Sequence, residues 1–114
     1  MPVLKITTNV TVSAASKTEV LKAASRLAAK ELDKPEGYVM VSVSDGAALL
    51  FGGNDQPCAF VELFSLGLPE ERAPRLSAML SGLLKESFGL DPRRVYVRMS
   101  DHPAHLWGWN GEVF

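Results

Sequence analysis

The chain opens with Met1-Pro2-Val3-Leu4-Lys5-Ile6-Thr7-Thr8, in which apolar and polar side chains largely alternate after Pro2. Such alternation is typical of a β-strand, so residues 3–8 are predicted to form one. A small second residue allows removal of the initiator methionine, which would leave the Pro2 nitrogen as a secondary amine. Burial in an apolar site lowers the pKa of such an amine from its usual ~7.7–8.0. Pro2 is therefore a candidate general base. The plain alternative is a proline that tolerates the first position of a strand.

The same pattern returns half a chain later. With a shift of 57 residues, half of the 114, residues 3–6 fall on residues 60–63 and residues 38–40 fall on 95–97. Leu27 falls on Leu84 and Pro35 on Pro92 in the same shift. This offset predicts two β-α-β units, residues 1–57 and 58–114, within one domain of residues 1–114. The predicted fold class is α+β: a four-stranded mixed sheet with two helices on one face.

Local signals give the expected boundaries of the helices. Residues 16–19, Ser-Lys-Thr-Glu, have the form of a capping box and predict a helix from there to Leu32. A second helix is expected to follow residues 68–71 and to end at Phe88, where Gly89 is a candidate C-terminal cap. The remaining strands are expected at residues 38–44, 58–65 and 95–100, and residues 101–114 form a tail rich in apolar side chains.

Composition limits the function classes. A net charge of −1 with no basic stripe argues against nucleic acid as a partner. No apolar run approaches the ~20 residues needed to span a bilayer, and no signal peptide is recognisable. Cys58 is the only cysteine, which suits a reducing cytoplasm, although release by a non-classical route stays open.

The predicted sheet has an uncovered face. Residues 38–43, Tyr-Val-Met-Val-Ser-Val, place apolar side chains on both sides of a strand, because side chains alternate between the faces. Two helices can cover only one face, and the sequence predicts no third helix. We therefore expect the chain to oligomerise through the uncovered face.

Eight short pieces, in this order and spacing, resemble the macrophage migration inhibitory factor family of the tautomerase superfamily. They are Met1-Pro2, Thr8-Asn9-Val10, Lys34-Pro35-x-x-Tyr38, Phe51-Gly52-Gly53, Pro57-Cys58-Ala59, Gly82-Leu83-Leu84, Arg94-Val95-Tyr96 and Gly108-Trp109-Asn110. The resemblance covers the whole chain. It implies a homotrimer with active sites at the subunit interfaces and keto-enol tautomerisation of aryl pyruvates such as phenylpyruvate, or of dopachrome-like compounds, without metal or cofactor.

The resemblance also implies roles for single residues. Pro2 matches the catalytic base, Lys34 the lysine that meets the substrate carboxylate, and Leu66 a position whose backbone contacts substrate. Tyr96 matches a tyrosine that reaches in from the neighbouring subunit. The aromatic walls of the site match Tyr38, Trp109 and Phe114.

Two positions depart from the mammalian cytokine of this family. Arg98 stands where the cytokine has an asparagine in the pocket, and an arginine there could form a bidentate pair with a carboxylate. Cys58-Ala59-Phe60-Val61 lacks the second cysteine of the cytokine's Cys-x-x-Cys pair, so dithiol redox chemistry is not expected.

The chemistry of the residues is compatible with the same reaction. Proton transfer between a carbon and a neighbouring carbonyl oxygen needs a base with a pKa near neutrality and a cation for the developing enolate. Pro2 supplies the first, and Lys34 or Arg98 the second.

Simpler explanations exist for each group. Lys34 also suits a solvated helix C-terminus, Tyr96 a plain strand position, and the tail aromatics core or subunit contacts. His102 and His105 have metal-like spacing, but Pro103 forbids a regular helix there, so no metal site is expected. The rival functions are a trimeric signalling or ligand-binding protein with a vestigial proline pocket, and a small regulatory module with a ferredoxin-like sheet.

Overall fold

Strand β1 (Val3–Thr8) lies at the centre of the sheet. It pairs in parallel with β2 (Met40–Ser44) and antiparallel with β3 (Ala59–Leu66), and β3 pairs in parallel with β4 (Val95–His102). The strand order is β2-β1-β3-β4. This computed structural model describes all residues 1–114.

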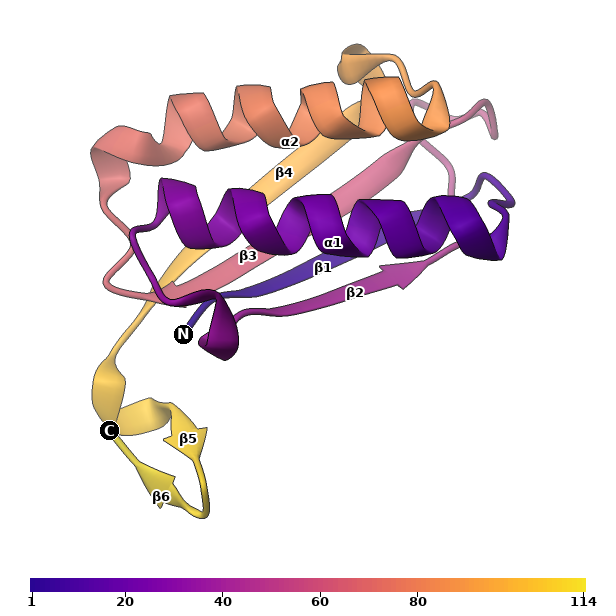
Figure 1. Cartoon of the computed structure of the whole chain (residues 1–114). Coiled ribbons are helices and arrows are strands. Elements are labelled where there is room, and N and C mark those ends of the chain that lie inside the picture. Colours follow the sequence, from indigo (N-terminus) through magenta and orange to yellow (C-terminus); the bar gives the residue numbers. More distant parts are fainter.

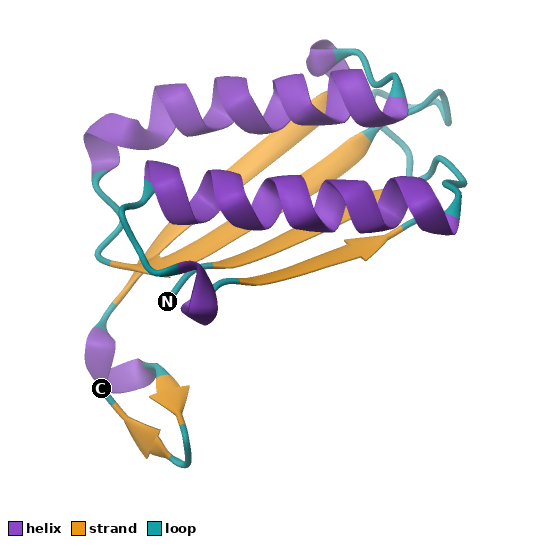
Figure 2. Ribbon diagram, viewed as in Figure 1, coloured by secondary structure: helices purple, strands orange, loops and turns teal.

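Helices α1 (Ala14–Glu31) and α2 (Ala73–Phe88) lie side by side over one face of the sheet, and the chain leaves the other face uncovered (Figures 1 and 2). The predicted α+β fold with two β-α-β units is therefore confirmed. That residues 1–57 and 58–114 arose by duplication of one β-α-β unit stays a prediction. Neither helix is long and apolar enough to cross a bilayer.

The hydrophobic core lies between the helices and the covered face of the sheet. Alternate residues of the central strands point into it, because the side-chain period of a strand is two. The fully buried side chains include Leu4 and Ile6 of β1, Val61 and Leu63 of β3, Val20 and Ala24 of α1, and Leu76, Leu80 and Leu84 of α2. This core holds the ends of the strands in place, and the candidate site lies at one of these ends.

The start of α1 differs from the prediction. The N-cap is Ser13, whose side chain accepts a hydrogen bond from the amide of Ser16 at 3.1 Å, and the helix begins at Ala14. The predicted capping box at residues 16–19 is therefore wrong. Two serines three residues apart compete for the cap, and Ser13 has the extended backbone that a cap requires. The end of α2 agrees with the prediction, since Gly89 caps it with a φ of 69°.

Strand β2 also begins later than predicted. Tyr38 lies in a single 3₁₀ turn, η1 (Glu36–Tyr38), because its amide donates to the carbonyl of Pro35 at 3.1 Å. This turn takes Tyr38 out of the sheet and toward the chain end that carries Pro2.

The uncovered face of the sheet is less apolar than predicted. Met40 and Phe60 are exposed on it, but Lys5, Glu62 and Arg98 form a row across β1, β3 and β4. This polar row tells against a purely hydrophobic interface on that face.

Candidate active site

Pro2 is buried at the beginning of β1, and its position is fixed by a strand-type bond. Its carbonyl accepts a hydrogen bond from the amide of Met40 at 3.0 Å, which extends the parallel β1–β2 pairing by one step. Because its ring is buried and its carbonyl is hydrogen-bonded, Pro2 is fixed in its position along the strand. The nitrogen of Pro2 therefore has a defined place at this end of the sheet.

Lys34 lies close to the same chain end. The break of α1 brings it there: Leu32 caps the helix, Asp33 has a φ of 53°, and the amide of Lys34 donates to the carbonyl of Ala29 at 2.9 Å. A β-carbon added at Gly67 would lie 3.9 Å from Lys34 Nζ. The ammonium group is therefore beside the turn that follows β3, next to Leu66.

The electrostatics at this end favour a neutral amine. In the chain that begins with Met1, burial and then the charge of Lys34 lower the pKa of the Met1 amino group below its ordinary value. Both effects act in the same direction, because desolvation and a neighbouring cation each disfavour the protonated form.

An apolar cavity of about 250 Å³ opens beside this chain end. The side chains that line it are those of Met1, Val3, Tyr38, Val39, Met40, Trp107 and Trp109. Tyr38 meets Trp109 edge to face with 5.8 Å between ring centroids, and Trp109 stacks on Phe114 at 6.4 Å. All three residues predicted as aromatic walls therefore lie together, and two of them, Tyr38 and Trp109, line the cavity.

The C-terminal tail supplies this wall from beyond β4. After the turn η4 (Ala104–Leu106), strands β5 (Gly108–Trp109) and β6 (Glu112–Val113) form a small hairpin at the end of the molecule that carries the N-terminus (Figure 1). The ring of His102 meets Phe64 at 5.6 Å and Trp107 at 5.8 Å, both edge to face, and so ties the tail to the sheet. In this chain His102 packs against aromatic rings.

Tyr96 and Arg98 lie elsewhere. Tyr96 pairs with Phe60, which pairs with Thr7, so Tyr96 is level with the end of β1 that is farthest from Pro2. Both Tyr96 and Arg98 are exposed on the uncovered face, as expected for residues two apart on a strand. The structure thus brings Pro2, Lys34, Leu66, Tyr38, Trp109 and Phe114 to one end of the chain and leaves Tyr96 and Arg98 outside that group.

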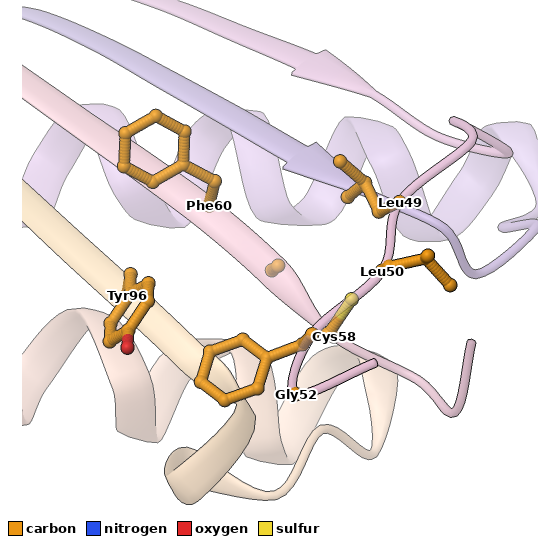
Figure 3. A pocket seen from close by; sticks show the side chains of 8 residues that line it. Leu49, Leu50, Gly52, Cys58, Phe60 and Tyr96 are labelled. Atoms are coloured by element: carbon orange, nitrogen blue, oxygen red, sulfur yellow. The ribbon is translucent and has the colours of Figure 1, made fainter. Parts of the chain in front are cut away.

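A second apolar cavity, of about 190 Å³, lies where Tyr96 is (Figure 3). Leu49, Leu50, Phe51, Cys58, Phe60 and Tyr96 line it. Phe51 and Tyr96 are in contact, with 4.8 Å between ring centroids.

Sequence reasoning missed several residues of these two regions. Met40 and Trp107 give no local signal, since an isolated apolar residue in a strand or loop is most often core, and Phe51 entered only as part of the resemblance, with no role assigned to it. Only the strand register could have placed Met40 beside Pro2.

Comparison with known proteins identifies the family of this chain. Residues 1–114 match the family model of macrophage migration inhibitory factor (MIF). The chain is 36% identical to a macrophage migration inhibitory factor homolog of Trichuris trichiura over the whole of both chains, and 36% identical to one of Brugia malayi over all of this chain and 99% of that one. It superposes on the crystal structure of a homologue from Prochlorococcus marinus with a TM-score of 0.94, 35% identity and 98% of each chain covered. The chain therefore belongs to the macrophage migration inhibitory factor family, within the tautomerase superfamily.

Proposed function

We propose that this protein is a keto-enol tautomerase of aryl pyruvates such as phenylpyruvate, and that the amine of Pro2 is its general base once Met1 has been removed. The observation that carries the proposal is the burial of Pro2 next to Lys34 and an apolar cavity. Removal of Met1 makes the nitrogen of Pro2 the new amine, and we expect burial and the charge of Lys34 to lower its pKa as they lower that of the Met1 amino group. A base of this kind is suited to proton transfer near neutral pH.

The other residues of this end have matching roles in the proposal. Lys34 holds the substrate carboxylate and stabilises the enolate as charge develops on oxygen. Tyr38, Trp109 and Phe114 enclose the aryl ring and exclude water, which strengthens the electrostatic interactions in the pocket. The backbone at Leu66 contacts the substrate. The Pro2 nitrogen takes a proton from the carbon next to the ketone, and the protonated amine then gives a proton to the enolate oxygen. One C–H bond breaks and one O–H bond forms, so the reaction balances without a cofactor.

The site is completed in this proposal by a second copy of the chain. Within its own chain Tyr96 is level with the end of β1 farthest from Pro2, and Arg98 is level with Lys5 in the middle of β1, so we propose that both serve a site built around another copy's Pro2. A homotrimer with three interface sites satisfies this requirement, and it covers Met40 and Phe60, which are exposed in the single chain. The proposed compartment is the cytoplasm.

The experiment compares two forms of the protein that differ only at the N-terminus. Intact mass identifies a sample without Met1 and one in which an added residue keeps the Pro2 nitrogen in an amide. The processed form should convert phenylpyruvate between its tautomers, and the blocked form should lose nearly all activity because an amide nitrogen is not basic.

Pro2→Gly in the processed form should keep part of the activity, since a primary amine still acts as a base. Full activity of the blocked form would refute the amine mechanism. Absence of activity in the verified processed form would favour the signalling or ligand-binding alternative with a vestigial pocket.

A further inference from the structure

The loop of residues 51–57 has little regular structure, and side chains supply most of its hydrogen bonds. Its only backbone pairing is an isolated bridge between Phe51 and Asn54. A loop whose carbonyl groups are bound by side chains has a fixed shape only while those side chains are present.

Arg94, at the end of the 3₁₀ turn η3 (Pro92–Arg94), binds four carbonyl groups of this loop. Nε donates to Pro57 at 3.0 Å, Nη1 to Phe51 at 3.1 Å, and Nη2 to both Gln56 at 3.0 Å and Asn54 at 3.3 Å. The guanidinium group has the rigid fork of donors that such an arrangement requires.

Asn9, directly after β1, binds the same loop from the other side. Its Nδ2 donates to the carbonyls of Asp55 at 3.0 Å and Gln56 at 3.2 Å, and its Oδ1 accepts from the amide of Cys58 at 2.9 Å. Asn9 therefore anchors the far part of the loop, whereas Arg94 is the side chain that also reaches Phe51.

The guanidinium of Arg94 also lies over the ring of Phe51, with 5.1 Å from its central carbon to the ring centroid. Phe51 in turn contacts the ring of Tyr96 at 4.8 Å with an interplanar angle of 44°. Tyr96 is 66% exposed, so few other groups of its own chain restrain it. The contacts thus run from Arg94 through Phe51 to Tyr96.

We propose that Arg94 is a positioning residue, which holds Phe51 against Tyr96 and so sets the direction in which the Tyr96 ring projects toward a neighbouring copy's site. This inference rests on the proposed function, in which Tyr96 serves a neighbouring copy's site, and it adds that the Tyr96 ring contacts the substrate there. A side chain that contacts the substrate and the transition state equally strengthens the binding of both by the same amount. Its displacement therefore raises KM and leaves kcat nearly unchanged.

The experiment uses Arg94→Gln in the processed, full-length protein, with Arg93→Gln as the matched control. Arg93 is exposed and pairs only with Asp91, at 2.8 Å. Arg94→Gln should raise KM for phenylpyruvate roughly three- to tenfold with kcat nearly unchanged, and Arg93→Gln should change neither. Arg94→Lys should keep most of the defect, because an ammonium group cannot bind four carbonyls in a fork.

A double-mutant cycle tests whether Arg94 acts through Tyr96. On a Tyr96→Ala background the further effect of Arg94→Gln should be close to none. An equal effect on both backgrounds, an unchanged KM in Arg94→Gln, or full rescue by Arg94→Lys would overturn the inference.

A second readout does not depend on activity. Cys58 is the only cysteine, is 2% exposed and lines the cavity beside Tyr96 (Figure 3). Arg94→Gln should loosen the loop and accelerate the reaction of Cys58 with a thiol reagent, relative to Arg93→Gln. An inactive wild type would refute the proposed function, but the labelling rates would still test whether Arg94 holds the loop. Equal labelling rates of Cys58 in Arg94→Gln and Arg93→Gln would refute that role of Arg94.

Discussion

The carbonyl of Pro2 accepts a 3.0 Å hydrogen bond from the amide of Met40. The bond uses the carbonyl and leaves the Pro2 nitrogen free of any role in the sheet. Loss of Met1 therefore leaves the strand pairing intact. An amine at this place is held in a fixed position and is buried close to the apolar cavity that Met1 and Val3 line, as a preorganised general base requires.

The charge of Lys34 predicts the pH dependence of activity. A neighbouring cation destabilises a protonated amine and so lowers its pKa, as it does for the amino group of Met1. In the proposed mechanism the base is the neutral amine of Pro2, so kcat/KM should rise with pH through the pKa of Pro2 and then level off. Lys34→Ala should raise that pKa and move the rising limb to higher pH.

Lys30→Ala is the control, because Lys30 is exposed in the last turn of α1. A full pH profile of kcat/KM for the three proteins measures the effect. A rising limb that stays in place in Lys34→Ala would show that Lys34 does not act on the base.

The separation of Tyr96 from Pro2 predicts an oligomer. Because the proposed site needs both residues and one chain keeps them at opposite ends of β1, active protein should be a trimer. Sedimentation equilibrium or light scattering should give three times the chain mass of 12.4 kDa at micromolar concentration. A monomer with full activity would contradict the shared site.

Much of this arrangement could be predicted from the sequence, for identifiable reasons. Strand alternation and the repeated offset give the sheet and its helices, because burial imposes those periods on the chain. The resemblance named Lys34 and Tyr38, and the fold does place them at one end with Pro2. Local periodicity could not show that Ser13 outcompetes Ser16 as N-cap, nor that Tyr38 leaves β2 for a 3₁₀ turn.

Contacts between segments that are distant in the sequence could not be predicted from the sequence either. The loop of residues 51–57 is bound by Asn9 and Arg94, which are more than 35 residues away from it in sequence. No local pattern records which carbonyl a long side chain will bind. The same holds for Glu31, whose partners lie on the other helix.

The pair of Glu31 and Arg75 joins the end of α1 to the start of α2. Arg75 Nε donates to the Glu31 carboxylate at 2.7 Å, and Arg72 donates to the Glu31 carbonyl. The hydrogen bond from Arg75 is the main reason that the pKa of Glu31 is lowered. Arg75→Ala removes the salt-bridge partner of a carboxylate whose side chain is only 9% exposed, which should lower Tm by a few degrees at pH 7.

The sign of the pH effect follows from the lowered pKa. Stability from the pair is fully present above the ordinary pKa of a glutamate and is lost as pH falls through the lower, folded-state value. The difference in Tm between wild type and Arg75→Ala should therefore shrink under acid conditions. Arg26→Ala, on an exposed arginine of α1 that forms no ion pair, is the control, and thermal unfolding at pH 7 and pH 3 measures both variants. A difference in Tm that grows at low pH would contradict the assigned role of the pair.

The last prediction concerns the cation that this chain has where the resemblance places an asparagine. Arg98 is exposed on the uncovered face, two residues from Tyr96, so the two side chains enter a neighbouring copy's site together or not at all. A charge-assisted hydrogen bond to a carboxylate typically contributes ~1.5–3 kcal/mol. Arg98→Ala should therefore lower kcat/KM for phenylpyruvate roughly ten- to a hundredfold.

The competing possibility is that Arg98 serves only its own sheet. It lies opposite Glu62, which lies opposite Lys5, so the Glu62 carboxylate could offset the charge of Arg98 within the chain. Substrate charge separates the two cases, because a carboxylate needs the cation and a methyl ester does not. Arg98→Ala and Lys34→Ala, singly and combined, should therefore be far more damaging for phenylpyruvate than for its ester. An Arg98→Ala enzyme that matches the wild type on phenylpyruvate would leave Lys34 as the cation that binds the carboxylate, and Arg98 as part of the row with Glu62.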